Sequence, residues 1–381
     1  MPTWYGAKMT KIYIVPIEPI DTRYTRQWYE HIPASLEREA AAIGKKIDIV
    51  VVDGEQVPPV PTPGAFLDFG ATNIYKSSQL GAIADEFQHG RVKPGDKFLF
   101  TDAWNPSVIS VRYMSELLKI PVKLHGMWHA GSYDPQDFLG RLIGNEPWVR
   151  HAEKAMMHAY DTNWFATNFH LDMFIRNLWG PFSKEAFEPT FDEVKAKWMV
   201  TRKVDLTGWP MDYLKTVLEP YSKLEKKNQI AFPHRLAPEK QLEIFKDLAS
   251  HMPEYEWIVC QEKELSKHEY HTILGESKMV FSANLQETYG ISMIEGLICG
   301  AMPLVPNRLS YVEMYDVGFK YPDEWTQSFE SYEKNREDLI GKIRAIMQYS
   351  ESNFLRSTMA SQLAMLDRYI RAVPLMNALL S

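Results

Sequence analysis

The sequence predicts an α/β protein of two doubly wound domains, each a parallel sheet covered by helices on both faces. The chain has 381 residues, and because a typical domain holds roughly 100–200 residues, two domains are expected. Short apolar runs alternate with longer segments whose apolar residues recur every three or four positions, the period of a helix. Strands that are apolar along their whole length and are separated by helices are typical of parallel sheets buried on both faces.

The first half of the chain contains one such alternating series. Its expected strands are residues 11–17, 47–52, 98–101, 122–125 and 163–166. The segments between them that carry the helical period are residues 26–43, 75–89, 106–119 and 147–160. This series predicts the first domain, which we place at residues 1–203.

The second half repeats the alternation after a polar, proline-containing stretch between residues 200 and 228. Its expected strands are residues 229–232, 256–260, 279–282 and 303–305, and its expected helices are residues 238–251, 266–275 and 291–299. We place the second domain at residues 204–350 and expect a C-terminal helix, residues 351–381, to return toward the first domain. Ligands of open parallel sheets bind at the carboxyl ends of the strands, so two facing domains predict a central cleft there.

Composition and charge exclude several classes of protein. Hydrophobic residues make up 45% and charged residues 24% of the chain, which excludes a disordered or fibrous protein. The net charge is 42 − 49 = −7, whereas proteins that hold nucleic acid by charge alone are usually basic.

Cys260 and Cys299 lie in apolar runs and cannot form a disulfide framework, which favours a reducing compartment. No apolar run approaches the roughly 18 residues of a membrane span, and the N-terminus lacks the apolar core of a signal peptide; a cytoplasmic enzyme without membrane insertion is expected.

The most informative segment is FSANLQETYGISMIEGLICGAMPLVP, residues 281–306. It predicts a strand, a loop, a helix that begins near Gly290 and stops at Gly300, and a second strand. Glu287 lies in the loop and Glu295 lies inside the helix. Gly290 would let a ligand approach the backbone N–H groups at the helix N-terminus, which form a natural anion site. The alternative is a generic βαβ unit with two solvated glutamates.

Two further segments carry candidate side chains. The run IAFPHRLAPEK, residues 230–240, passes from a strand into a helix and places Arg235 and Lys240 five positions apart; the alternative is two solvated cations beside a helix N-terminus. The run VKLHGMWHAGSYD, residues 122–134, is predicted to end a strand at His125 and Gly126, with His129 close behind. A single histidine after a strand is more often structural.

Residues 281–306 resemble the E-x7-E signature of retaining glycosyltransferases of the GT-B fold, most like family 4, which reads roughly E-[TS]-[FY]-G-x4-E-[AG]-x3-G-x-P-V. Residues 230–240 resemble the family's G-R-L-x3-K element, with His234 in place of the glycine. Residues 122–134 resemble its fourth strand, which ends in His and Gly. The matched positions of the signature are Glu287, Thr288, Tyr289, Gly290, Glu295, Gly296, Gly300 and Pro303.

The resemblance implies that the first domain holds an acceptor and the second binds a nucleotide-sugar, most often a UDP-sugar, whose hexosyl or pentosyl group is transferred with retention of configuration. Arg235 and Lys240 would meet the donor diphosphate, the first as a fork and the second as a point charge. Glu295 would hold the ribose hydroxyls, Glu287 the sugar hydroxyls, and His125, with His129 as a rival, would lie beside the sugar and the acceptor. The implied catalytic residues are His125, Glu287, Arg235 and Lys240, and the implied donor-binding residues are Arg235, Lys240, Glu287, Thr288, Tyr289, Gly290, Ile291 and Glu295.

No metal and no cofactor is expected. The sequence has no D-x-D pair, which GT-A glycosyltransferases generally need for a metal, and neither a Cys/His cluster nor the H-x3-H spacing of His125 and His129 supports zinc. His268 and His271 lie in a polar helical stretch and are expected to face solvent. The phosphate-binding patterns G-x4-G-K-[ST] and G-x-G-x2-G are also absent, which argues against an NTPase or a dehydrogenase.

The acceptor is less constrained. Family members usually carry a glycine-rich loop after the first strand, but residues 16–29 contain no glycine. Asp21, Arg23, Arg26 and His129 are candidates to bind an acceptor; the alternative for the first three is an ordinary loop and helix start. Residues 26–43 are near neutral and contain Pro33, unlike a basic membrane-docking helix.

The N-terminal segment resembles glycosyltransferases associated with tailed phages, several of which modify hydroxymethylated pyrimidines in DNA. That resemblance makes modified DNA a candidate acceptor and the host cytoplasm the location, although the negative net charge speaks against DNA. The alternatives are a soluble glycan or small-molecule acceptor, a GT-B-fold epimerase or phosphorylase, and a non-catalytic sugar-nucleotide-binding protein on the same scaffold. The oligomeric state stays open.

Overall fold

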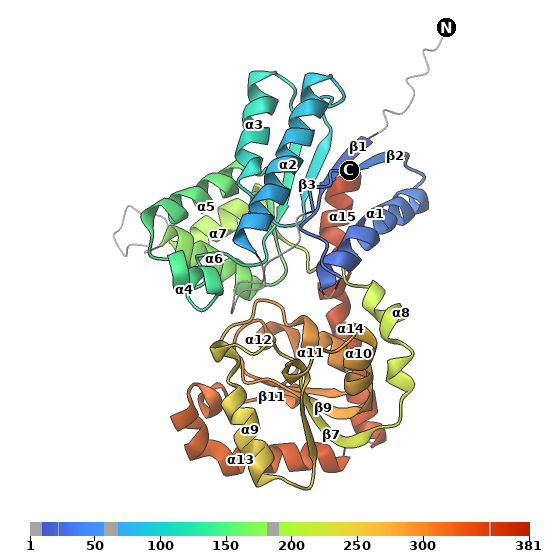
Figure 1. Cartoon of the computed structure of the whole chain (residues 1–381), viewed down its shortest axis with the longest axis vertical. Coiled ribbons are helices and arrows are strands. Elements are labelled where there is room, and N and C mark those ends of the chain that lie inside the picture. Colours follow the sequence, from blue (N-terminus) through green and yellow to red (C-terminus); the bar gives the residue numbers. More distant parts are fainter. Residues whose placement is uncertain (1–9, 22, 57–67, 181–189, 350–351) are drawn as a thin grey trace. The chain divides into compact units, whose positions relative to one another are not determined.

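The computed structural model describes residues 10–21, 23–56, 68–180, 190–349 and 352–381. These residues form two compact units (Figure 1). The first unit comprises Met1–Ala166, Leu171–Pro210 and Ala372–Ser381, and the second comprises Thr167–His170 and Met211–Arg371. No helix within the described ranges is long and apolar enough to span a membrane.

The first unit contains a six-stranded, all-parallel sheet with the order β2-β1-β3-β4-β5-β6. Its strands are β1 (Thr10–Val15), β2 (Ile47–Val51), β3 (Lys97–Phe100), β4 (Lys123–Met127), β5 (Thr162–Phe165) and β6 (Val204–Leu206). The first five match expected strands. β6 was not expected, and it pairs with β5, so residues 204–206 lie in the sheet of the first unit although we placed them in the second domain.

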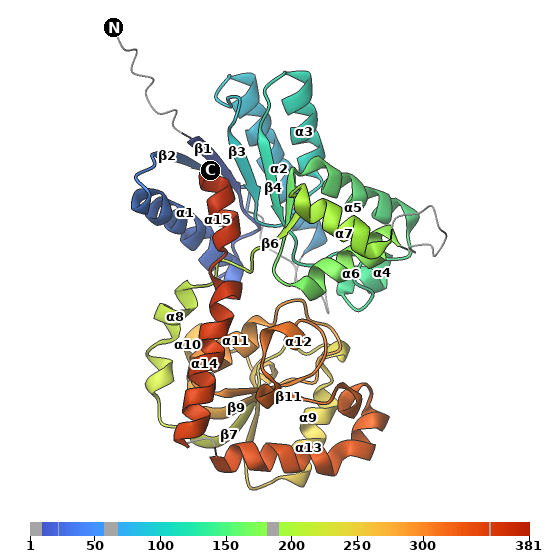
Figure 2. The same ribbon diagram turned by 180° about the vertical axis from the view of Figure 1, so that it is seen from behind.

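Helices cover this sheet on both faces. One face packs its alternate apolar side chains, among them Tyr13, Phe98 and Phe100, against helices α2, α3, α5 and α6. On the other face α1 and α15 lie side by side (Figures 1 and 2). The helices are α1 (Tyr24–Ala42), α2 (Phe69–Gln88), α3 (Ser107–Leu117), α4 (Phe138–Ile143), α5 (Pro147–Ala159), α6 (Asn168–Trp179), α7 (Phe191–Val200) and α15 (Val373–Leu380).

The second unit contains a five-stranded parallel sheet with the order β11-β10-β9-β7-β8. Its strands are β7 (Lys227–Phe232), β8 (Glu256–Val259), β9 (Ser277–Phe281), β10 (Met302–Pro306) and β11 (Lys320–Tyr321), of which β11 was not expected. Its helices are α8 (Tyr213–Leu218), α9 (Leu242–His251), α10 (Lys267–Glu276), α11 (Ile291–Ile298), α12 (Tyr311–Met314), α13 (Phe329–Tyr349) and α14 (Asn353–Ile370).

The core of this unit lies between the sheet and α9 and α13, where Ile230, Phe281 and Leu304 meet Phe245 and Ile343. Figure 2 shows α14 beside α11 and α12. The helix expected at residues 238–251 is interrupted: Pro238–Lys240 forms a 3-10 turn, and Gln241 is left-handed at φ 53° before α9 begins. The helix expected at residues 351–381 is divided into α14 and α15, because Ala372 turns the backbone at φ 48° between them.

Candidate functional site

The loop between β9 and α11 holds most of the predicted donor-binding residues. Gly290 caps the N-terminus of α11 with φ 81° and ψ 53°. A Cβ at this position would come within 2.8 Å of Tyr311 Cε1. Both the left-handed backbone and the close ring therefore require a glycine. Thr288 and Tyr289 are buried, and the Tyr289 hydroxyl donates to the Tyr369 carbonyl at 2.8 Å. Ile291 is the first residue of α11.

The Glu287 carboxylate is held from three directions in this loop. Its Oε2 lies 3.4 Å from Lys240 Nζ and 3.4 Å from Asn284 Nδ2, and its Oε1 lies 3.4 Å from the Tyr289 backbone nitrogen. Burial alone would raise the pKa of Glu287, but Lys240 and the backbone N–H groups of Tyr289 and Gly290 outweigh it, and the pKa is lowered. Glu287 is therefore an ionised hydrogen-bond acceptor, with a side chain 20% exposed.

The two predicted cations follow β7 but differ in surroundings. Lys240 is buried, and its ammonium donates to the Gln286 carbonyl at 2.6 Å as well as contacting Glu287. Lys240 thus links the 3-10 turn Pro238–Lys240 to the loop between β9 and α11. Arg235 pairs with Glu239 and remains about one-third exposed. The structure brings Lys240 to Glu287 and keeps Arg235 beside Glu239.

His234 stands where the resembled family has glycine, and it fills space between β7 and α11. Its ring is buried, and its Nδ1 lies 3.4 Å from both Asn284 Nδ2 and Ser292 Oγ. Burial, then Lys240, lowers the pKa of His234 to about 3, so the ring is neutral. In place of the family's glycine, the histidine supplies a side chain that packs against the loop between β9 and α11 and against the start of α11.

Glu295 lies on α11 and faces α10. The Tyr270 hydroxyl donates to Glu295 Oε2 at 3.0 Å, and His271 Nε2 lies 3.8 Å from Oε1. The side chain is 15% exposed. The expectation that His271 faces solvent is wrong, because α10 turns this residue into the protein, whereas His268 is exposed.

Arg308 supports the loop between β9 and α11 and was missed by sequence reasoning. Its guanidinium donates to the carbonyls of Ala283 and Asn284, each at 2.7 Å, and to Asp323 Oδ1 at 3.0 Å. Gln241 Nε2 reaches the same Ala283 carbonyl at 2.5 Å. The only signal in the sequence was an arginine three residues after a predicted strand, which is too common to be diagnostic.

In the first unit, His129 lies just beyond the carboxyl end of β4. Its Nε2 is 2.5 Å from the Thr101 carbonyl, and its Nδ1 is 2.8 Å from the Tyr24 hydroxyl. A carbonyl can only accept, so Nε2 carries the proton and Nδ1 accepts from Tyr24. The ring also packs edge-on against Trp209, with centroids 4.0 Å apart. Burial lowers the pKa of His129 to about 4, which makes the neutral form dominant near pH 7.

His125 has a different position from the one predicted, because β4 continues to Met127. It lies in mid-strand, opposite Leu99 and Thr162, and is 5% exposed. Its Nδ1 accepts from Trp164 Nε1 at 3.2 Å. Burial lowers the pKa of His125 to about 4. Of the two histidines, His129 is the one beyond the end of the strand.

The remaining acceptor candidates lie at the loop after β1 and the start of α1. The Asp21 side chain is 92% exposed and lies 3.7 Å from Arg26, which also pairs with Glu30 at 3.0 Å. Arg23 precedes α1, and its guanidinium lies over the Tyr24 ring. The Tyr24 hydroxyl is hydrogen-bonded to His129, and the positive charge of Arg23 contributes to the lowered pKa of that histidine.

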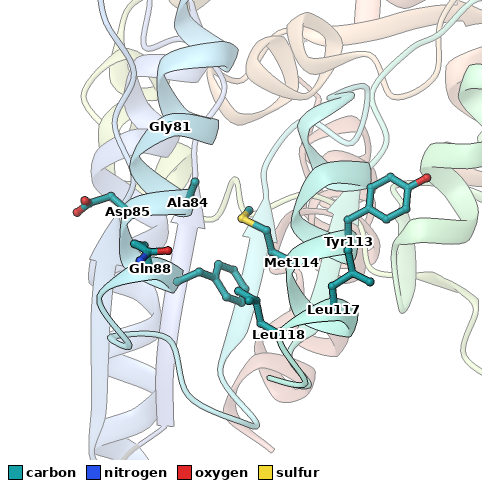
Figure 3. Close-up of a pocket in the computed structure, with 9 residues that line it drawn as sticks. Gly81, Ala84, Asp85, Gln88, Tyr113, Met114, Leu117 and Leu118 are labelled. Carbon is teal, nitrogen blue, oxygen red and sulfur yellow. The ribbon is translucent and has the colours of Figure 1, made fainter.

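Two surface grooves lie away from these residues. One, of about 570 Å³, runs between α2 and α3 and is lined by Phe87, Met114 and Leu118 (Figure 3). It lies near the C-terminal ends of both helices, which follow their strands and run back toward the amino edge of the sheet. The other, of about 540 Å³, includes Arg150 and Lys154. Among the described residues, no group of three or more His, Cys, Asp or Glu side chains is arranged to hold a metal ion.

No protein-family model matches the sequence. Solved structures do match the fold over nearly the whole chain. A glycosyltransferase from Rickettsia africae aligns over 98% of this chain and 100% of its own, at 11% identity and a TM-score of 0.56. The chain has the GT-B fold. The catalytic domain of starch synthase IV from Arabidopsis thaliana, bound to ADP and acarbose, aligns over 97% and 100%, at 10% identity and a TM-score of 0.54.

A third GT-B match is the Anabaena protein Alr3699/HepE in complex with UDP and glucose. It aligns over 97% of this chain and 98% of its own, at 11% identity and a TM-score of 0.53. At such identities the likeness establishes the architecture of two parallel-sheet α/β domains, with six and five strands. The chemistry must therefore be argued from the residues of this chain.

Proposed function

We propose that the chain is a glycosyltransferase that moves a sugar from a nucleotide-sugar donor to an acceptor hydroxyl, with retention of the anomeric configuration and without a metal ion. The observation that carries this proposal is the arrangement around α11. An ionised Glu287 precedes the helix, the left-handed Gly290 exposes its N-terminus, and Glu295 lies one turn inside it. This is the constellation that the resemblance assigns to a nucleotide-sugar.

The groups in this unit have the chemistry to bind both ends of the donor. The Glu295 carboxylate, oriented by Tyr270 and His271, accepts hydrogen bonds from the ribose hydroxyls. The N–H groups at the start of α11 face the diphosphate, where the helix dipole favours negative charge. Arg235 releases Glu239 to meet the same phosphates, and Glu287 holds the sugar hydroxyls.

The chemical step breaks the bond between the anomeric carbon and the diphosphate oxygen, so negative charge grows on the leaving phosphate. The α11 N–H groups, Lys240 and Arg235 stabilise that charge in place of a metal. Glu287 and Glu295 belong to one donor-binding element, so we do not assign them as the paired carboxylates of a glycosidase. His129 is the histidine we now favour beside the reacting sugar, because it lies beyond the strand end as a neutral ring.

We propose UDP as the nucleotide, which is also the nucleotide bound in the Anabaena structure, while the starch synthase structure contains ADP. The decisive experiment is a thermal-shift panel of UDP-, GDP-, ADP- and CMP-linked sugars in EDTA. A ligand that binds the folded state raises the melting temperature. We expect one UDP-sugar to do so, and proton NMR of the transferred linkage to show the anomeric configuration of the donor.

Glu295→Ala should weaken donor binding at least tenfold, because hydrogen bonds to a charged group contribute about 1.5–3 kcal/mol. Arg235→Ala should lower the transfer rate. The matched control is Glu243→Ala, which removes an exposed glutamate of α9 and should leave the shift intact. A flat panel for the unmodified chain would contradict the proposal. A shift without transfer to any acceptor would instead support a non-catalytic sugar-nucleotide-binding protein.

A further inference from the structure

Three buried polar side chains in the first unit have hydrogen-bonding atoms that no described residue satisfies. Both carboxylate oxygens of Glu18 lack a hydrogen-bond partner among the residues that the structure describes, although Glu18 is only 9% exposed. The same holds for Gln79 Oε1 and Thr72 Oγ1, whose residues are 0% and 6% exposed. We call Glu18, Thr72 and Gln79 the polar cluster. Buried polar atoms are almost always paired, so four such atoms on these three side chains require an explanation.

The polar cluster lies at the carboxyl edge of the sheet, where ligands of parallel sheets bind. Glu18 is three residues beyond the end of β1. Gln79 Nε2 donates to the Pro16 carbonyl at 2.8 Å and the Val52 carbonyl at 3.0 Å, next to the ends of β1 and β2. Both partners can only accept, so the amide orientation is determined and Oε1 is left without a donor. Thr72 lies seven residues before Gln79 and therefore on the same side of α2.

The neighbouring donors are already committed elsewhere. Lys76 Nζ binds Asp102 Oδ2 at 3.0 Å and the Trp104 carbonyl at 2.8 Å. The Tyr75 hydroxyl donates to Asp53 Oδ1 at 2.9 Å. Burial, then Asp53, and more weakly Glu18, raise the pKa of Tyr75, so this hydroxyl keeps its proton. Glu18 is thus a buried carboxyl group for which the described residues supply neither a cation nor a hydrogen-bond donor. Burying such a group lowers the stability of the fold, which is unusual for a residue with only a structural role.

We propose that the polar cluster binds vicinal hydroxyl groups of a sugar-like or polyol-like acceptor. This proposal rests on the proposed transfer of a sugar and specifies the acceptor class. Glu18 and Gln79 Oε1 need hydrogen donors, and Thr72 can donate or accept. A polyhydroxylated ring supplies several O–H donors at once.

Charge argues for a neutral acceptor over nucleic acid at this position. A phosphodiester supplies acceptors only, so it cannot satisfy Glu18 or Gln79 Oε1. It would also be repelled by Glu18 and by the nearby Asp53 and Asp102 carboxylates, of which Lys76 compensates one. The polar cluster therefore favours a soluble glycan over hydroxymethylated DNA.

The test is direct binding of methyl α-glucoside, methyl β-galactoside, methyl N-acetylglucosaminide and maltose to the full chain without donor, by saturation-transfer NMR and titration. We expect at least one glycoside to bind. Glu18→Gln should weaken it about fivefold, because neutral hydrogen bonds replace charge-assisted ones, and Glu18→Leu should abolish it. The control Glu37→Gln, an exposed glutamate of α1, should bind as the unmodified chain does.

Melting temperature separates binding from a structural role. Glu18→Leu replaces a buried carboxyl group that has no partner among the described residues with an apolar side chain, so the variant should fold and melt at a higher temperature. A lower melting temperature together with unchanged glycoside binding by Glu18→Gln would overturn the proposal. So would failure of every glycoside to bind the unmodified chain.

Two further results discriminate between the proposals. Binding of a duplex that contains 5-hydroxymethylcytosine, lost in Glu18→Leu, would overturn the glycan assignment in favour of DNA. Glycoside binding without any nucleotide-sugar shift would overturn the proposed transfer but leave a polyol site at the polar cluster. The donor assay depends on Glu295 and the glycoside assay on Glu18, so the two failures are distinguishable.

Discussion

Buried histidines couple the stability of this protein to pH at the level of single residues. Burial lowers the pKa of His125 and of His129 to about 4 and that of His234 to about 3. In the unfolded chain a histidine has a pKa of about 6.5. At a pH between the folded and the unfolded pKa, these histidines are protonated in the unfolded state but not in the folded state. The stability contribution is therefore complete above about pH 6.5 and is lost as the pH falls toward 4.

We predict that His125→Gln reduces the dependence of stability on pH. The variant removes one group that titrates only on unfolding, so its free energy of unfolding should decrease less between pH 7 and pH 4.5 than that of the unmodified chain. Urea denaturation at both pH values measures the difference. His151→Gln changes an exposed histidine and serves as the control. Identical pH slopes for His125→Gln and the unmodified chain would refute the prediction.

At the level of the element, α11 depends on how its N-terminus is built. Gly290 turns the chain at φ 81°, Arg308 and Gln241 hold the carbonyls of the preceding loop, and Lys240 caps the Gln286 carbonyl. These contacts come from the segments after β7 and β10. The helix N-terminus is therefore presented by a loop whose backbone is anchored on both sides.

Replacing Gly290 by alanine should destabilise the second unit by about 1–3 kcal/mol, because the new Cβ would meet Tyr311 and the backbone would be strained. Donor-induced thermal shifts should shrink as well. Gly341 is the matched control: it lies inside α13, and a Cβ there meets nothing within 4 Å. Gly341→Ala should stabilise the chain by up to about 1 kcal/mol. Equal melting temperatures for the two variants would contradict this explanation.

At the level of the whole molecule, the last ten residues belong to the first unit although they follow the second in sequence. α15 buries Leu375 and Leu379 there. Lys97 of β3 donates to the carbonyls of Ala378 at 2.8 Å and Leu379 at 3.1 Å. Burial lowers the pKa of Lys97 to about 8, and the carbonyls at the helix C-terminus stabilise the remaining positive charge.

We predict that deleting residues 372–381 destabilises the first unit selectively. The deletion would leave the Lys97 ammonium without these acceptors and expose the apolar side chains that α15 covers. Hydrogen exchange should accelerate in β1 and β3 more than in β7 and β9. Lys45→Ala, which removes a more exposed contact to the same helix end, should change exchange little. Uniform acceleration across both sheets would contradict a selective effect.

The sequence by itself determined much of this architecture. Apolar runs such as residues 98–101 and 279–282 identified nine of the strands, because a strand buried on both faces must be apolar throughout. Residues 287–295 similarly predicted a loop and a helix beginning beside Gly290. Such features depend on local residue order, so they can be read without knowing the packing.

Only the tertiary structure decided which polar groups meet. β6 and β11 are too short to carry a pattern, and β4 runs two residues past His125, which moves His129 to the strand end. The partners of Glu295 come from α10, and Arg308 holds two carbonyls of the loop between β9 and α11. Glu18 gave no sequence signal at all: its interest lies in lacking a partner among the described residues, and a missing partner becomes visible only once segments distant in the chain are packed together.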